Sequence, residues 1–229
     1  MKSLRLWHIS AAFFAICAAL NLYGCIIESG LADTVKPALM PLLCLTTMAA
    51  LAQGVGIKSH EAKLLACAQL FGFGGDTALI GSDAFALFAL GIGLFLVGHI
   101  FYITLFGGKS WKGLKLWAWV VAVVVALTAV ACLVKAIGIS GALMAPMAVY
   151  GLMLMTLIFS TLTGALRFKT LTWWLLTAGA VMFTFSDSLI AIRTFGHLSP
   201  LMSGFGVMAT YLLAQTLLAI GSYRLISQK

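Results

Sequence analysis

The stretch "LWAWVVAVVVALTAVACLV" (Leu116–Val134) contains no charged side chain. A helix needs about 20 mostly apolar residues to cross a bilayer, so this stretch predicts a transmembrane helix. The rest of the chain has a similar composition. Of its 229 residues, 62% are apolar and 9% are charged, whereas a soluble domain carries about 25% charged residues. Because the apolar runs are continuous rather than alternating, they exclude a β-barrel and indicate an all-α polytopic membrane protein.

Apolar runs of spanning length recur along the whole chain and are separated by short polar breaks. We therefore predict eight transmembrane helices in a single domain over residues 1–229, without a soluble domain or a long linker. Asp83 lies at the shortest break and is expected to be a loop residue or a helix cap. The predicted spans are 7–27, 38–54, 64–82, 84–106, 116–134, 142–165, 171–193 and 201–223.

The basic residues predict how the chain is oriented. Of the 14 lysines and arginines, all but Lys36, Lys135 and Arg193 fall on the side of the N-terminus in this topology. Cytoplasmic loops carry an excess of Lys and Arg, so we expect both termini in the cytoplasm and the protein in a bacterial inner membrane. The net charge of +8 then marks cytoplasmic loops and does not indicate nucleic-acid binding.

The spacing of two prolines and two aspartates indicates an internal repeat. Pro41 precedes Asp76 in the second and third predicted helices, and Pro146 precedes Asp187 in the sixth and seventh. Matching positions four helices apart predict a parallel 4+4 repeat, a form of duplication found in membrane proteins. Such a repeat would place the two aspartates at similar depth, facing a shared pseudo-axis.

Asp76 and Asp187 are the acidic residues embedded in predicted spans. A charge at the bilayer centre costs at least about 2.5–3.5 kcal/mol, so these side chains should face the bundle interior or a cavity. Both predicted helices run outward, which lets the two carboxyls meet in the outer half of the membrane. The alternative is that each carboxyl only forms hydrogen bonds between helices.

Further polar residues accompany the aspartates. His99 and Tyr102 are three positions apart and share one helix face, nearer the cytoplasmic end. Lys36 and Arg193 lie at the outer mouth, where they either extend to the membrane surface or meet a phosphate headgroup. Tyr150 is expected to reach the level of the aspartates.

Several site chemistries do not fit the sequence. The five cysteines lie in apolar runs and show no metal-ligand spacing with histidine. There is no mid-membrane lysine for a Schiff base, and Ser186 has no histidine at its depth for a catalytic triad. We therefore expect neither a metal nor a cofactor, and a pair of carboxylates remains.

Five motifs stand in one order between Lys36 and Leu218: "KPALMPLL", "GDTALI", "GLFLVGHIFYITLF", "APMAVYGLMLM" and "GAVMFTFSDSLIAI". In this order they resemble the YhhN-like membrane proteins, the lysoplasmalogenase family. The resemblance implies an eight-helix enzyme that hydrolyses the vinyl ether bond of lysoplasmalogens to a fatty aldehyde and glycerophosphoethanolamine or glycerophosphocholine. The family's polar positions correspond here to Lys36, Asp76, His99, Tyr102, Tyr150, Ser186 and Asp187.

This chemistry suits a pair of carboxyls. Protonation of a vinyl ether on carbon gives an oxocarbenium ion, and glycosidases stabilise a comparable ion with two carboxyl groups. Burial and mutual repulsion keep one of two neighbouring carboxyls protonated, so Asp76 and Asp187 are predicted to act as acid and base. Tyr150 and Ser186 would orient water or the ether oxygen.

The expected partners are the lysophospholipid substrate and membrane lipids. Lys36, and with it Arg193, would hold the substrate phosphate, while the hydrocarbon chain would lie in a cavity lined by Phe and Leu. The rival reading is a small transporter with proton-binding carboxylates. An intramembrane aspartyl protease is disfavoured because Phe73 occupies a position where that class has glycine. A structural or lipid-binding scaffold is the remaining alternative.

Overall fold

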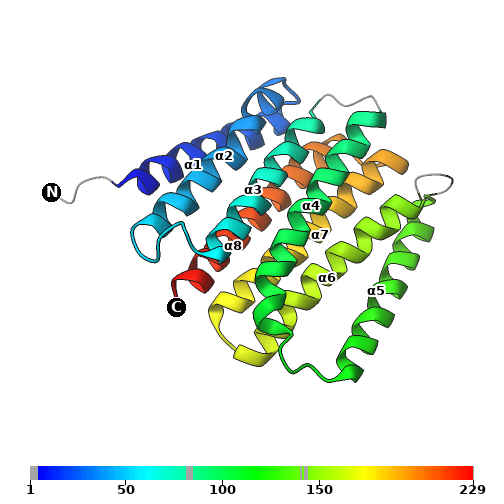
Figure 1. Ribbon diagram of the computed structural model, residues 1–229. Helices are drawn as coiled ribbons and strands as arrows, with labels where there is room; N and C mark the ends of the chain where they lie inside the picture. The colour runs from blue at the N-terminus through cyan, green and yellow to red at the C-terminus, as the bar shows by residue number, and fades with distance from the viewer. Residues whose placement is uncertain (1–4, 81–84, 140, 142–143, 229) are drawn as a thin grey trace.

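The computed structural model describes the chain except for residues 1–4, 81–84, 140, 142–143 and 229, so Asp83 lies outside the described residues. Within the described part the protein is all helical, with eight long α-helices and no strand (Figure 1). In chain order these elements are α1 (Leu6–Ile26), α2 (Leu31–Ala52), α3 (His60–Ala78), α4 (Phe85–Ser110), α5 (Leu116–Ile137), α6 (Met144–Phe168), α7 (Leu171–Phe195), the short π-helix η2 (Met202–Gly206) and α8 (Val207–Ser227).

The predicted order of helices is confirmed, but several boundaries differ from the prediction, and the largest difference is at the start of α2. Helix α2 begins at Leu31 instead of residue 38, because Pro37 and Pro41 are accommodated inside the helix. Proline is tolerated in this way where neighbouring helices cover the backbone. Helix α3 begins and ends four residues earlier than predicted, since the Ser59 hydroxyl accepts a hydrogen bond from the amide of Ala62 and starts the helix.

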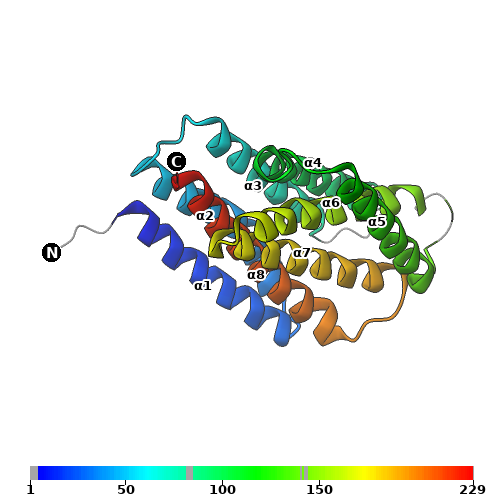
Figure 2. The ribbon, with the colours of Figure 1, turned by 90° about the horizontal axis from the view of Figure 1, so that it is seen from below.

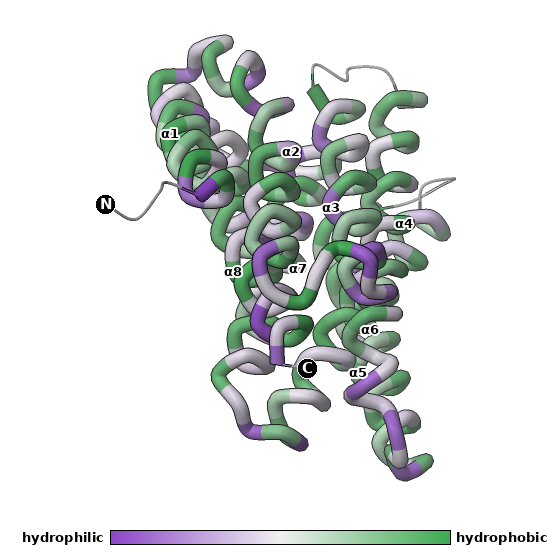
Figure 3. The backbone as a smooth tube through the Cα atoms, turned by 60° about the vertical axis from the view of Figure 1, so that its left-hand side comes forward, coloured by the Kyte–Doolittle hydropathy of each residue, from purple (hydrophilic) through white to green (hydrophobic). Residues whose placement is uncertain are grey.

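Seven helices in the described part are long and apolar enough to cross a membrane, which makes this an integral, multi-pass membrane protein. The exception is α3, which carries Glu61, Lys63, Gln69 and Asp76 within 19 residues. It nevertheless packs against α2, α4 and α8. The tube in Figure 3 shows hydrophilic residues gathered mainly near the ends of largely hydrophobic helices.

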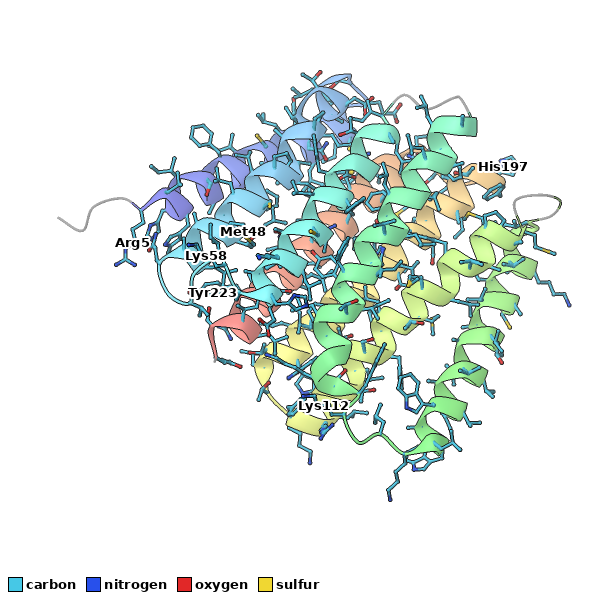
Figure 4. All side chains as sticks on the ribbon, viewed as in Figure 1. Arg5, Met48, Lys58, Lys112, His197 and Tyr223 are labelled. Carbon is cyan, nitrogen blue, oxygen red and sulfur yellow. The ribbon has the colours of Figure 1, made fainter. Side chains whose placement is uncertain are left out.

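The two ends of the bundle carry different side chains. The start of α1 and the end of α8 lie at one end of the bundle (Figure 1), which also carries Arg5, Lys58 and Lys112 (Figure 4). We name this the terminal end. His197 lies at the other end (Figure 4), which we name the opposite end. The cytoplasmic location of the terminal end stays a prediction.

The helices pack as neighbours in a way that leaves α5 at the edge. The closest pairs are α1 with α2, α3 with α4, and α7 with α8, while α6 packs on both α4 and α7. Helix α5 packs chiefly on α6 and lies at the rim of the bundle (Figure 2). Helix α2 also contacts α8, and the 4+4 repeat remains a prediction.

A glycine positions one aromatic ring at the α3–α4 interface. A Cβ atom at Gly75 would lie 2.8 Å from the ring of Phe95, closer than real Cβ contacts. Glycine therefore lets Phe95 pack directly on α3, next to Asp76, as small residues generally allow close approach of membrane helices.

Candidate active site

Two carboxyl groups form the centre of the candidate site. Asp76, in the last turn of α3, is 3% exposed and accepts a hydrogen bond of 2.5 Å from the Tyr211 hydroxyl of α8. Asp187, on α7, is half-buried and accepts a hydrogen bond from the Tyr150 hydroxyl of α6. The two carboxyls are close enough to interact electrostatically. Four helices therefore contribute to one pair of tyrosine-bonded carboxyls.

A chain of polar side chains orients Tyr211. The Gln215 amide nitrogen lies 3.3 Å from the Tyr211 hydroxyl oxygen and donates to it, so the tyrosine proton points toward Asp76. The Tyr102 hydroxyl in turn donates to the Gln215 carbonyl oxygen at 3.4 Å. Buried polar groups that satisfy one another in this way hold a single geometry.

An aromatic cluster of Phe95, His99, Phe183 and Tyr211 adjoins the carboxyl site through the hydrogen bond between Tyr211 and Asp76. The Phe183 ring centre lies 4.6 Å from that of His99, 5.6 Å from that of Tyr211 and 6.1 Å from that of Phe95. The rings meet edge to face, which is a favourable arrangement. The cluster gives the site an apolar wall on the side facing the terminal end.

His99 belongs to this wall. Its Nδ1 lies 2.6 Å from the carbonyl oxygen of Phe95 and donates to it, which leaves Nε2 as an acceptor. Within the described residues this buried Nε2 has no hydrogen-bond partner. The His99 ring also lies 5.9 Å from that of Tyr150, the residue that is bonded to Asp187.

A cavity of about 460 Å³ opens at the opposite end, between α1, α2, α7 and η2, and we name it the vestibule. It carries charged groups of both signs. Its described polar and charged lining residues include Asn21, Glu28, Ser29, Asp33, Lys36, Arg193 and Ser203.

The vestibule floor separates it from the carboxyls. The floor is formed by apolar residues, among them Leu79, Ile190 and Met208. Leu79 follows the end of α3 and lies three positions beyond Asp76, while Ile190 on α7 lies three positions beyond Asp187. Met208 on α8 precedes Tyr211 by three positions, so all three stand toward the opposite end of the bundle. The carboxyls therefore lie about 4.5 Å, nearly one helical turn, beneath the floor and do not line the vestibule themselves.

The predicted site residues divide between these two places. Lys36 and Arg193 come together in the vestibule, and Lys36 also acts electrostatically on Asp76. Tyr150 is bonded to Asp187, whereas Tyr102 is bonded to Gln215.

Ser186 differs from these residues, because it faces α8 and is fully buried. Its hydroxyl donates to the carbonyl oxygen of Val207 at 3.0 Å.

The sequence analysis did not single out Tyr211, Gln215, Phe95 and Phe183. Tyr211 and Gln215 lie four positions apart in an apolar span and so share one helix face, a signal that could have identified them. The two phenylalanines carry no such signal, because phenylalanine is common in membrane helices. Their place beside the carboxyls follows from packing alone.

Comparison with known proteins places these residues in a family context. The model of the YhhN family matches residues 31–222, which include both aspartates, both bonded tyrosines, Lys36 and Arg193. Among the polar and charged residues named above for the vestibule, Asn21, Glu28 and Ser29 precede the matched range. Neither a curated protein nor a solved structure matches the chain.

Proposed function

The chain belongs to the YhhN family, as its motifs predicted, and on that premise we propose that it hydrolyses the vinyl ether bond of a lysoplasmalogen. The products would be a fatty aldehyde and a glycerophosphoethanolamine or glycerophosphocholine. The observation that carries the proposal is the pair of carboxyls, each bonded to a tyrosine hydroxyl, beneath a vestibule that contains two cationic side chains.

The proposed reaction uses both carboxyls of the site. One carboxylic acid transfers its proton to the outer carbon of the vinyl ether, which leaves an oxocarbenium ion. Water adds to that ion while the second carboxyl, as carboxylate, accepts a proton from the water. The hemiacetal then collapses to the aldehyde as its hydroxyl proton passes to the leaving oxygen of the alcohol. One water is consumed, the proton given to carbon stays in the aldehyde, and the proton taken from water leaves the carboxyl pair again with one proton. Two neighbouring carboxyls in largely apolar surroundings suit these roles because they do not readily carry two charges at once.

The aromatic cluster would stabilise the cationic intermediate. Phe183 and Tyr211 present π systems beside the carboxyls, and a cation near an aromatic face is stabilised by about 0.5–2 kcal/mol. Tyr150 is placed to orient water at Asp187, since its hydroxyl is already bonded to that carboxyl. These groups act in a site where the apolar surroundings strengthen electrostatic interactions.

The vestibule suits the phosphate of a lysolipid. Lys36 and Arg193 lie there together, and such cations bind phosphate by charge-assisted hydrogen bonds. A glycerol backbone of a few bonds separates the phosphate from the vinyl ether, a length comparable to the one turn between the vestibule floor and the carboxyls. For the ether to reach the carboxyls, floor side chains such as the flexible Met208 must move aside.

Aldehyde release from purified protein supplied with 1-alkenyl lysophosphatidylethanolamine tests the proposal. We expect Asp76→Asn and Asp187→Asn each to lower turnover about 10²–10⁴-fold, because asparagine keeps the shape but cannot exchange the proton. Glu61→Gln, at the start of α3 and far from the site, is the matched control and should retain activity. Full turnover in either aspartate variant would contradict the mechanism.

A proton-coupled carrier that uses the same carboxyls is the second candidate. The Asp76 carboxyl, buried within α3, favours it, because ionisable groups inside membrane helices often form proton relays in pumps and transporters. Substrate counterflow in liposomes, without aldehyde release, would favour the carrier over the hydrolase.

A further inference from the structure

The vestibule carries groups suited to both ends of a zwitterion. Its cations are Lys36 and Arg193, and its carboxylates are Glu28 and Asp33. Asp33 interacts electrostatically with Arg193. A lone phosphate would need only the cations, so the carboxylates indicate a ligand that also carries a positive charge.

Two buried acceptors in the vestibule lack a hydrogen-bond donor. Asn21 is 1% exposed, and its amide nitrogen donates to the carbonyl oxygen of Ala32 at 2.8 Å, which fixes its Oδ1 as the remaining acceptor. Within the described residues neither this Oδ1 nor the buried hydroxyl oxygen of Ser29 has a hydrogen-bond partner. Buried acceptors are normally satisfied, so these two indicate a ligand that donates N–H groups.

The described lining residues of the vestibule include no aromatic side chain. Quaternary ammonium groups, which have no N–H, are typically recognised by aromatic cages. A primary ammonium instead offers three N–H donors, as the lysine ammonium does. The lining therefore suits a primary ammonium better than a trimethylammonium.

The backbone at Glu28 supports a role for its side chain. Glu28 has φ +50°, in the left-handed region that favours glycine. The amide of Ser29 donates to the carbonyl of Gly24 at 3.0 Å, as in a Schellman motif, where the left-handed residue is usually glycine. A carboxylate held at such a strained position points to a function for that carboxylate.

We infer that the vestibule binds a phosphoethanolamine headgroup in preference to phosphocholine. The phosphate would lie on Lys36 and Arg193, and the primary ammonium on Asn21 and Ser29, within the field of Glu28 and Asp33. This inference rests on the proposed lysolipid substrate, but it concerns binding and does not depend on turnover.

Binding of non-cleavable 1-alkyl lysophospholipids to the full chain in nanodiscs tests the inference. The tail is held constant while the headgroup runs from ethanolamine through its N-methyl and N,N-dimethyl forms to choline. We expect affinity to fall with each methyl and by about tenfold or more over the series, because each methyl removes an N–H donor. Equal affinity across the series would overturn the inference. Discrimination without aldehyde release from the 1-alkenyl lipid would overturn only the proposed reaction.

Glu28→Gly is the matched variant. It removes the carboxylate while suiting the left-handed backbone, so the fold should be retained and the preference for ethanolamine should fall about threefold or more. Lys169→Gly is the control, because Lys169 has a similar φ of +53° at the terminal end. It should leave the preference unchanged. An unchanged preference in Glu28→Gly and in Asp33→Asn would overturn the assignment of the ammonium site.

Discussion

Single residues distinguish the two carboxyls of the site. Tyr211, which bonds Asp76, is itself oriented by Gln215, whereas the hydrogen bonds of the described residues give Tyr150 only Asp187 as a partner. Asp76 is buried and Asp187 is half-buried. Asp187 is therefore better placed than Asp76 to react with water, because it is more exposed and its partner Tyr150 is less constrained.

Removal of the Tyr150 hydroxyl tests this difference. We expect Tyr150→Phe to lower aldehyde release about 10–100-fold, because a hydrogen bond to a charged group is worth about 1.5–3 kcal/mol. The measurement is kcat on the 1-alkenyl lysolipid, alongside the unfolding temperature in detergent. Tyr23→Phe, at an exposed position of α1, is the control. A fall in activity that merely follows a fall in folded protein would contradict the prediction.

Ser186 gives a second prediction at this scale. Its hydroxyl is used in the contact between α7 and α8, so Ser186→Ala should lower the free energy of unfolding by about 0.5–1.5 kcal/mol and leave the activity of the folded protein unchanged. Thermal unfolding and aldehyde release together measure this. If turnover falls while stability does not, Ser186 orients the water, as the sequence analysis predicted.

At the scale of helices, hydrophobic periodicity and charge could predict which helices form. They could not predict which faces of neighbouring helices are in contact. The intramembrane aspartates were predictable because a charge in an apolar span is costly and therefore faces inward. The start of α2 was not, since Pro37 reads as a helix start and yet lies inside the helix. The contacts of Ser186 and Phe183 depend on the rotation of α7 against α4 and α8, which sequence periodicity does not determine.

The packing of α3 on α4 yields a prediction at this scale. A Cβ at Gly75 would lie 2.8 Å from the Phe95 ring, so Gly75→Ala should destabilise the protein by about 1–3 kcal/mol and displace a wall of the site. Gly93→Ala on α4 is the matched control, because a Cβ there would meet nothing within 4 Å. It should be neutral or stabilising by up to about 1 kcal/mol. Unfolding in detergent distinguishes the two variants, and equal stability would contradict the packing argument.

At the scale of the whole molecule, the ends of the bundle predict its orientation. Lys58 lies at the terminal end with other basic residues, and His197 lies at the opposite end (Figure 4). Because cytoplasmic loops are enriched in Lys and Arg, the vestibule should open to the outer side of a bacterial inner membrane. A lysolipid would then enter from the outer leaflet.

Cysteine labelling measures this orientation. With the five native cysteines replaced by serine, His197→Cys should react with a membrane-impermeant maleimide on intact cells. Lys58→Cys should react only after the cells are permeabilised. Retained aldehyde release in both variants shows that the labelled protein is folded. The reverse labelling pattern would place the vestibule in the cytoplasm.

The weakly apolar α3 has a consequence for how the chain is made. This helix enters the membrane third, with Asp76 near its far end, but the tyrosine that bonds Asp76 belongs to α8, the last helix to be synthesised. Until α8 arrives, the carboxyl has no such partner, and little in α3 itself favours insertion. Assembly of the site therefore coincides with completion of the chain, so a chain truncated before α8 should leave α3 poorly inserted and exposed to quality-control proteolysis.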